Sequence, residues 1–139
     1  MKNKLKDTKI NLKIVIAGLW IAIMFLYIYN DIFHLFKPDA IQNMMDGQMG
    51  PFAVTQMGLF TATVLMVIPS LMIIAALVCP AKMNRIANII FGSLYTIVNI
   101  ANLPGEWVFY IFSGVIQIFI TLTIVWISIK WPKQVLENN

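Results

Sequence analysis

Residues 14–30, "IVIAGLWIAIMFLYIYN", form an apolar run without a single charge, and this run decides the kind of fold. A helix that crosses a membrane needs about 20 predominantly apolar residues. Three more charge-free runs follow, over residues 47–81, 86–105 and 107–129. Each run supports one helix, because even the longest is too short for two spans and a turn.

The composition places these helices in lipid. Of the 139 residues 60% are hydrophobic and 12% are charged, and the mean hydropathy is +0.81. A soluble domain carries about a quarter charged residues, and one of this size cannot hide so much apolar surface. Nucleic acid is not an expected partner, because the basic residues form no basic face. The single cysteine, Cys79, excludes an intramolecular disulfide and a CxxC redox pair.

We therefore predict an all-α, membrane-embedded four-helix bundle with up-down-up-down order. It forms a single domain over residues 1–139, with helices near 12–36, 52–79, 86–103 and 107–130. Prolines at positions 38, 80, 104 and 132 mark the helix ends. Pro69 lies inside the second helix, where it should bend the helix and free the Leu65 carbonyl. That helix would be roughly 42 Å long, against a hydrocarbon layer of about 30 Å.

The basic residues predict the orientation. Nine of the ten fall on one side of a four-span chain: Lys2, Lys4, Lys6, Lys9, Lys13, Lys82, Arg85, Lys130 and Lys133. Only Lys37 falls on the other side. The positive-inside rule makes the first side cytoplasmic. We expect a multi-pass protein of the inner (plasma) membrane with both termini in the cytoplasm.

Ionisable residues near the end of the first apolar run are candidate site residues. Tyr27, Asp31 and His34 are spaced i, i+4, i+7 and share one helix face. Asp31 follows Lys13 by eighteen residues, which puts it about 27 Å up the helix, near the edge of the hydrocarbon. Asp31 and His34 then either mark the membrane boundary or take part in chemistry.

The third helix offers a matching stripe. Tyr95, Asn99 and Asn102 have the same spacing and rise toward the same outer surface, and Glu106 follows just past the turn. If the two stripes face each other, they form an outward-opening polar vestibule. Its members are Tyr27, Asp31, His34, Asn99, Asn102 and Glu106. No metal-ligand spacing such as HxxxH is present, so we expect neither a metal site nor a cofactor.

Gln117 lies near the bilayer centre, with Ser113 and Thr121 one turn to either side. A neutral polar residue at this depth most often bridges two helices by a hydrogen bond. A contact with a transported substrate is the other interpretation.

Several stretches carry a family resemblance together: "KINLKIVIAGLW" (9–20), "FLYIYNDIFHLF" (25–36), "NRIANIIFGSLYT" (84–96), "WVFYIF" (107–112) and "IVWISIKWPK" (124–133). In this order and spacing the chain resembles a family of small bacterial four-helix integral membrane proteins, domain of unknown function 6326. The resemblance covers nearly the whole chain. It implies a four-span protein of a bacterial inner membrane and brings no activity or site residues.

Three functions are compatible with the sequence. The first is a non-enzymatic structural or accessory bundle, because every polar residue has an interfacial or packing role. The second is a small oligomeric transporter or proton- or ion-coupled carrier that uses Asp31, His34 and Glu106. The third is a membrane enzyme acting on lipid or quinone, with His34 as acid-base. Besides the bilayer, the expected partners are further copies of the chain or another membrane protein.

The orientation can be tested with topology reporters. A reporter that is active only in the cytoplasm should be active when fused after Asn139. A reporter that is active only in the periplasm should be active when inserted within residues 40–50. Both outcomes follow from the side on which nine basic residues lie. A C-terminus on the periplasmic side would contradict the orientation and the outward-opening vestibule with it.

Overall fold

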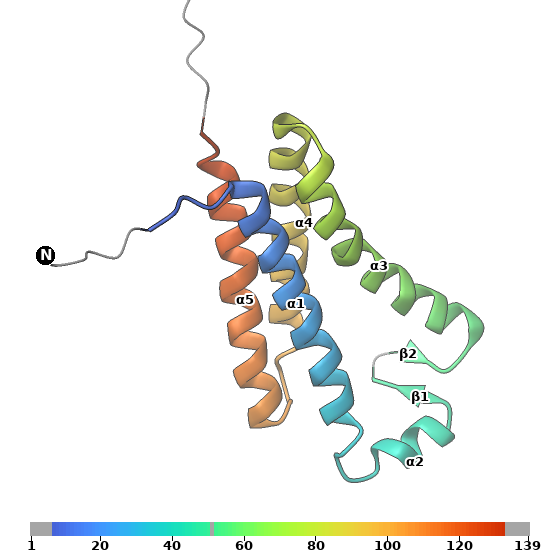
Figure 1. Cartoon of the computed structure of the whole chain (residues 1–139). Coiled ribbons are helices and arrows are strands. Elements are labelled where there is room, and N and C mark those ends of the chain that lie inside the picture. The colour runs from blue at the N-terminus through green and yellow to red at the C-terminus, as the bar shows by residue number, and fades with distance from the viewer. Residues whose placement is uncertain (1–6, 51, 133–139) are drawn as a thin grey trace, which may run out of the picture.

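A computed structural model of the chain describes residues 7–50 and 52–132, and it is all-α apart from one short hairpin (Figure 1). Its helices are α1 (Leu12–His34), α2 (Ala40–Met45), α3 (Gln56–Val78), α4 (Ala81–Ala101) and α5 (Val108–Ile129). Strands β1 (Gln48–Met49) and β2 (Phe52–Ala53) pair antiparallel. The described part therefore holds five helices, one more than the sequence predicted, because a one-and-a-half-turn helix forms in the connection after α1.

The second long helix begins later than predicted. Phe52 pairs with Met49 in the hairpin, so this segment is extended and not helical. Thr55 then starts α3, since its hydroxyl accepts a hydrogen bond of 3.0 Å from the Gly58 backbone N–H. With 23 residues, α3 is about 34 Å long, so the predicted excess over the hydrocarbon layer largely disappears.

The other boundaries also shift. The first helix ends at His34 and not near residue 36, ahead of the Lys37–Pro38 pair. The third starts at Ala81 and not near residue 86, directly after Pro80, so Lys82 and Arg85 belong to the helix. Charge-free runs could not reveal this, because a helix continues through charged residues once they reach the membrane surface.

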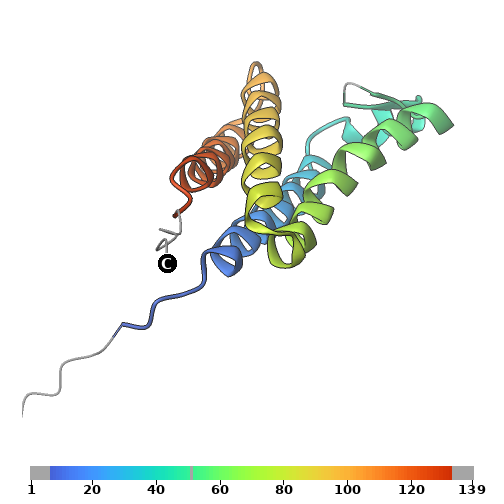
Figure 2. The same ribbon diagram turned by 90° about the horizontal axis from the view of Figure 1, so that it is seen from above.

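The long helices associate as two pairs. α4 packs mainly against α5 and α1 mainly against α3, while α1 also contacts α5 and α3 also contacts α4. Seen from above, the two pairs lie side by side (Figure 2). The first half of α3 leans away from α4 and α5 (Figure 1). Only Pro69, Met72 and Ala76, all in its second half, are buried.

A glycine sets the closest approach between α4 and α5. A Cβ at Gly92 would lie 2.8 Å from Val125 Cγ2, so a larger residue would require the Val125 side chain or the helices to shift. Gly92 and Thr96 form a pair of small residues spaced four apart, and Gly18 and Ala22 form another. Another such residue, Gly18, has nothing within 4 Å of an added Cβ. Spacing alone therefore does not identify the interface.

Charged side chains tie the helix ends together. Lys13 Nζ donates to the Cys79 carbonyl at 2.6 Å, and so caps the C-terminus of α3. Arg85 Nε donates to the Ser128 carbonyl at 3.2 Å, near the C-terminus of α5. At the opposite end, Lys37 and Glu106 form an ion pair of 3.0 Å. The start of α1 thus lies beside the end of α3, and the start of α4 beside the end of α5.

Burial is inverted relative to a soluble bundle. The buried residues of the described part include nine apolar ones: Ile16, Ala17, Trp20, Ile23, Pro69, Met72, Ala76, Tyr95 and Ile124. Eight others are polar: Asn30, Asn84, Asn88, Thr96, Asn99, Gln117, Thr121 and Ser128. Large hydrophobic side chains are exposed along every long helix, for example Phe25, Ile74, Ile90 and Phe119. Soluble proteins rarely present such a continuous apolar surface.

Three of the described helices are long and apolar enough to cross a membrane: α1, α3 and α5. The sequence predicted four spans, and α4 is the helix that this criterion leaves out. Lys82 and Arg85 lie in its first turns, and Asn84, Asn88 and Asn99 lower its hydropathy further. These asparagines are buried inside the bundle, so the mean hydropathy of α4 understates how apolar its outer surface is.

Pro69 makes it possible to test one hydrogen bond inside the bundle. It lies within α3 and removes the N–H that would bond the Leu65 carbonyl. The Tyr95 hydroxyl donates to that freed carbonyl, and Tyr95 also packs edge-to-face on Trp20, with ring centroids 6.0 Å apart. The carbonyl freed by proline, expected from the sequence, thus has a partner on α4.

We expect Tyr95→Phe to lower the free energy of unfolding by about 1 kcal/mol, the order of a single hydrogen bond in a membrane bundle. The loss should shrink in a Pro69→Ala background, because residue 69 can then donate to Leu65 within the helix. Unfolding of the four proteins in detergent gives the coupling energy. Equal losses in both backgrounds would show that the Tyr95 hydroxyl does not stabilise α3.

Candidate functional site

The candidate site is a polar seam along α4, which we define as Asn84, Asn88, Tyr95, Thr96 and Asn99. Together with Gly92 these residues follow a helical spacing (84, 88, 92, 95/96 and 99) and are all buried, so they occupy one inward face of the helix. Ile86, Ile90, Leu94, Ile97 and Ile100 lie between them and are exposed. The helix is thus amphipathic with its polar side facing the other helices.

At one end of the seam, a chain of hydrogen bonds joins three helices. Trp20 Nε1 on α1 donates to Asn88 Oδ1 at 2.7 Å. Asn88 Nδ2 donates to Asn84 Oδ1 at 2.5 Å, and Asn84 Nδ2 donates to the Ala76 carbonyl on α3, also at 2.5 Å. Each amide therefore accepts through its oxygen and donates through its nitrogen, which fixes both orientations.

The middle of the seam connects to α5. Thr96 Oγ1 donates to Thr121 Oγ1 at 2.8 Å, and both side chains are buried. The Thr121 hydroxyl in turn donates to the Gln117 carbonyl at 3.0 Å within its own helix. Together with the Tyr95 contact to α3, these bonds mean that the seam touches all three of the other long helices.

Near the opposite end, Tyr27 on α1 donates to Asn99 Oδ1 at 2.7 Å. Two residues of the predicted vestibule are therefore in direct contact. The Asn99 side chain is 3% exposed, and its Nδ2 is buried without a hydrogen-bond partner among the described residues. A buried donor left unpaired costs about 1–3 kcal/mol, so the packing around Asn99 is less favourable than that at the other end of the seam.

Gln117 is buried, as its mid-helix position predicted, but its amide nitrogen donates to Ser113 on the same helix at 3.2 Å. Among the described hydrogen bonds, the bridge from this part of α5 to α4 is made by Thr121 instead. The antiparallel register set by Thr96 and Thr121 places Gln117 at about the depth of Asn99.

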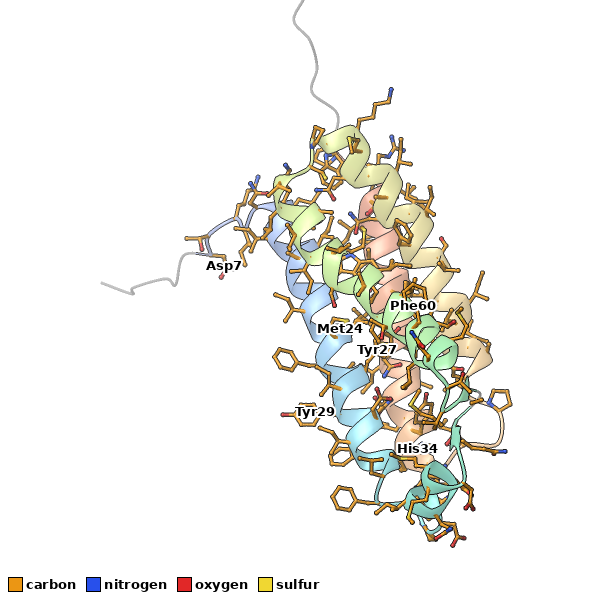
Figure 3. The ribbon with its side chains drawn as sticks, turned by 90° about the vertical axis from the view of Figure 1, so that its right-hand side faces the viewer. Asp7, Met24, Tyr27, Tyr29, His34 and Phe60 are labelled. Carbon is orange, nitrogen blue, oxygen red and sulfur yellow. The ribbon has the colours of Figure 1, made fainter. Side chains whose placement is uncertain are left out.

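The remaining vestibule residues differ in exposure and in the neighbours they contact. Asp31 and Asn102 are exposed. His34 is half-buried, and its ring lies edge-on to Tyr110 of α5 with centroids 6.2 Å apart. Figure 3 shows Tyr27 and His34 on the side of α1 that faces the other helices, and Tyr29 pointing away.

Glu106 is engaged by a residue that the sequence analysis did not assign to the site. Its carboxylate pairs with Lys37, whose ammonium also lies 5.7 Å from the centroid of the Trp107 ring. A cavity of about 480 Å³ adjoins this pair, and Phe33, Phe36, Lys37, Trp107 and Phe109 line it. None of the six predicted vestibule residues lines that cavity, which is mainly aromatic.

The seam residues Asn84 and Asn88 were also missed. The signal was present in the sequence, because residues 84, 88, 92, 95, 96 and 99 are small or polar at helical spacing. This stripe lies opposite the isoleucines and identifies the face of α4 that the bundle buries.

The chemistry of the seam is that of neutral amides, hydroxyls and an indole. Such groups bind by hydrogen bonding, and they bring neither a strong base nor a charged nucleophile. Within residues 7–50 and 52–132, no group of three His, Cys, Asp or Glu side chains could hold a metal ion. The arrangement is suited to holding helices together and to contacting a small polar molecule.

Comparisons with known proteins identify the family to which the chain belongs. No curated protein matches the chain, and no solved structure matches it. A family described as a family of unknown function, DUF6326, matches residues 3–138, which is nearly the whole sequence. The chain belongs to this family.

Proposed function

We propose that the protein is a four-span integral membrane protein that acts as a structural or accessory bundle and not as an enzyme. The observation that carries this proposal is the inverted burial, with asparagines and threonines inside and isoleucines and phenylalanines outside. In lipid, polar side chains must be satisfied within the protein. α4 meets this condition as a fourth span because its polar seam faces the bundle.

The charge distribution supports an orientation with both termini in the cytoplasm of a bacterium, in its inner membrane. Lys13, Lys82 and Arg85 lie at the same end of the bundle, where two of them cap helix C-termini. Lys130 follows α5 at that end as well. An excess of lysine and arginine is typical of cytoplasmic surfaces.

The non-enzymatic assignment rests on how the polar groups are used. Most seam side chains donate to or accept from one another or from backbone carbonyls. General acid-base catalysis needs a positioned proton donor or acceptor with a partner, and His34 contacts an aromatic ring. An enzyme acting on lipid or quinone therefore has the least support.

A carrier is the second candidate, and one observation favours it. The unpaired Asn99 Nδ2 is buried beside Tyr27, and Asp31 lies one helical turn beyond Tyr27 toward the surface. An ionisable residue within a span marks an ion pathway by default. In this version the ion pair of Lys37 and Glu106 would cover the outer end of the pathway.

Membrane insertion of α4 can be tested on its outer face. Ile90 is 57% exposed at the middle of α4, and a lysine at the centre of a membrane helix costs about 2.5–3.5 kcal/mol. We expect Ile90→Lys to reduce the carbonate-resistant membrane fraction strongly. Ile10→Lys is the matched control, since Ile10 is 67% exposed but precedes α1. Equal accumulation of the two variants would mean that α4 faces water.

Measurements of proton flux distinguish the structural role from the carrier role. The purified chain is reconstituted in vesicles that contain a pH-sensitive dye, and a proton gradient is imposed with sodium and potassium present. If the role is structural, vesicles that contain the protein should leak protons at the rate of protein-free vesicles. Asp31→Asn should leave this rate unchanged. A faster flux that Asp31→Asn abolishes, with the folded bundle intact, would overturn the structural role in favour of the carrier.

A further inference from the structure

A groove opens at the proposed cytoplasmic end of the bundle. It lies where α4 begins and α5 ends, and it has a volume of about 260 Å³. Its lining consists of Ala81, Lys82, Arg85, Ile86, Trp131 and Pro132. Two of these side chains are cationic and none is acidic, so the groove is suited to an anion.

Arg85 is held in place for such a role. Its Nε donates to the Ser128 carbonyl at 3.2 Å, and its Nη2 donates to the Ile129 carbonyl at 3.4 Å. A guanidinium has five N–H donors, so three remain after these two bonds. The bonds to α5 fix the plane of the guanidinium, which reduces the side-chain entropy that binding would cost.

The rest of the lining indicates a lipid and not a free ion. Ile86, Trp131 and Pro132 give the groove apolar walls, and Ile86 and Ile90 are exposed on successive turns of α4. Tryptophan is favoured at the level of lipid headgroups. An acyl chain could follow the two isoleucines while the phosphate lies between Lys82 and Arg85.

We propose that this groove binds the phosphodiester headgroup of an anionic phospholipid in the cytoplasmic leaflet. The proposal rests on the membrane assignment above and names a lipid that the bundle would hold. The negative charge meets Lys82 and the free N–H groups of Arg85, and the glycerol region packs against Trp131. Basic pockets on the cytoplasmic side of membrane helices bind lipid headgroups by these interactions.

Native mass spectrometry of the purified full chain tests the groove. The chain is titrated with phosphatidylglycerol or phosphatidylcholine in detergent, and the bound fraction is read for each lipid. We expect tenfold or tighter binding of phosphatidylglycerol, because only this lipid carries net charge. Lys82→Gln should weaken phosphatidylglycerol binding about fivefold, the effect of one lysine near an anionic surface, and Lys82→Arg should restore it.

Lys130→Gln is the matched control. Lys130 follows α5 at the same end, but its ammonium lies 4.4 Å from the centroid of the Trp126 ring, and it does not line the groove. This variant should bind phosphatidylglycerol within twofold of the original chain. Equal binding of the two lipids, or equal losses in Lys82→Gln and Lys130→Gln, would overturn the proposal.

Inorganic phosphate distinguishes the headgroup from a free anion. We expect millimolar phosphate to leave phosphatidylglycerol bound, since it lacks the apolar contacts, and displacement would overturn the lipid assignment. The measurement is made in detergent and does not depend on orientation in a membrane. If the chain did not prefer phosphatidylglycerol, the Ile90→Lys result on membrane insertion would be unaffected. If Ile90→Lys did not reduce membrane insertion, the lipid-binding data in detergent could still be interpreted.

Discussion

Buried polar groups need hydrogen-bond partners where water is absent, and most of those partners in this structure lie along the polar seam of α4. In a soluble bundle an asparagine on the buried face is a cost, because an apolar residue would pack there at no loss of hydration. In the membrane that we propose for this bundle, its interior is where Asn84 and Asn88 find partners. Their bonds to Trp20 and to the Ala76 carbonyl then decide which helices lie against α4.

The same requirement extends to the backbone of α3. Pro69 leaves the Leu65 carbonyl without its helical partner, and the Tyr95 hydroxyl on α4 takes that place. A helix with a proline therefore depends on a neighbour that carries a donor at the matching depth. This links two features that are far apart in the sequence, and it explains why a tyrosine lies on the inward face among asparagines and threonines.

Much of this arrangement is predictable from the sequence, but the parts differ in physical origin. The long helices follow from uninterrupted apolar runs, and the freed Leu65 carbonyl follows from proline chemistry. The connection after α1 was not predictable from hydropathy, because α2 and the hairpin depend on local hydrogen bonds such as those between Met49 and Phe52. The hydrogen bond between Tyr27 and Asn99 agrees with the expectation that the polar stripes of α1 and α4 face each other. The ion pair between Lys37 and Glu106 was not predicted, because only the folded structure brings these two residues together.

The charged residues at the two ends of the bundle make different interactions, and this difference links helix capping to the proposed orientation in the membrane. At one end Lys13 and Arg85 donate to the last carbonyls of α3 and α5, where the partial negative charge of each helix dipole is greatest. At the other end a lysine is paired with a carboxylate, so it adds no net charge. The cations that close the first end are therefore among those that the positive-inside rule counts. In the orientation that we propose, replacing them with neutral residues would remove a helix cap and an orientation signal at once, so both roles constrain the same side chains.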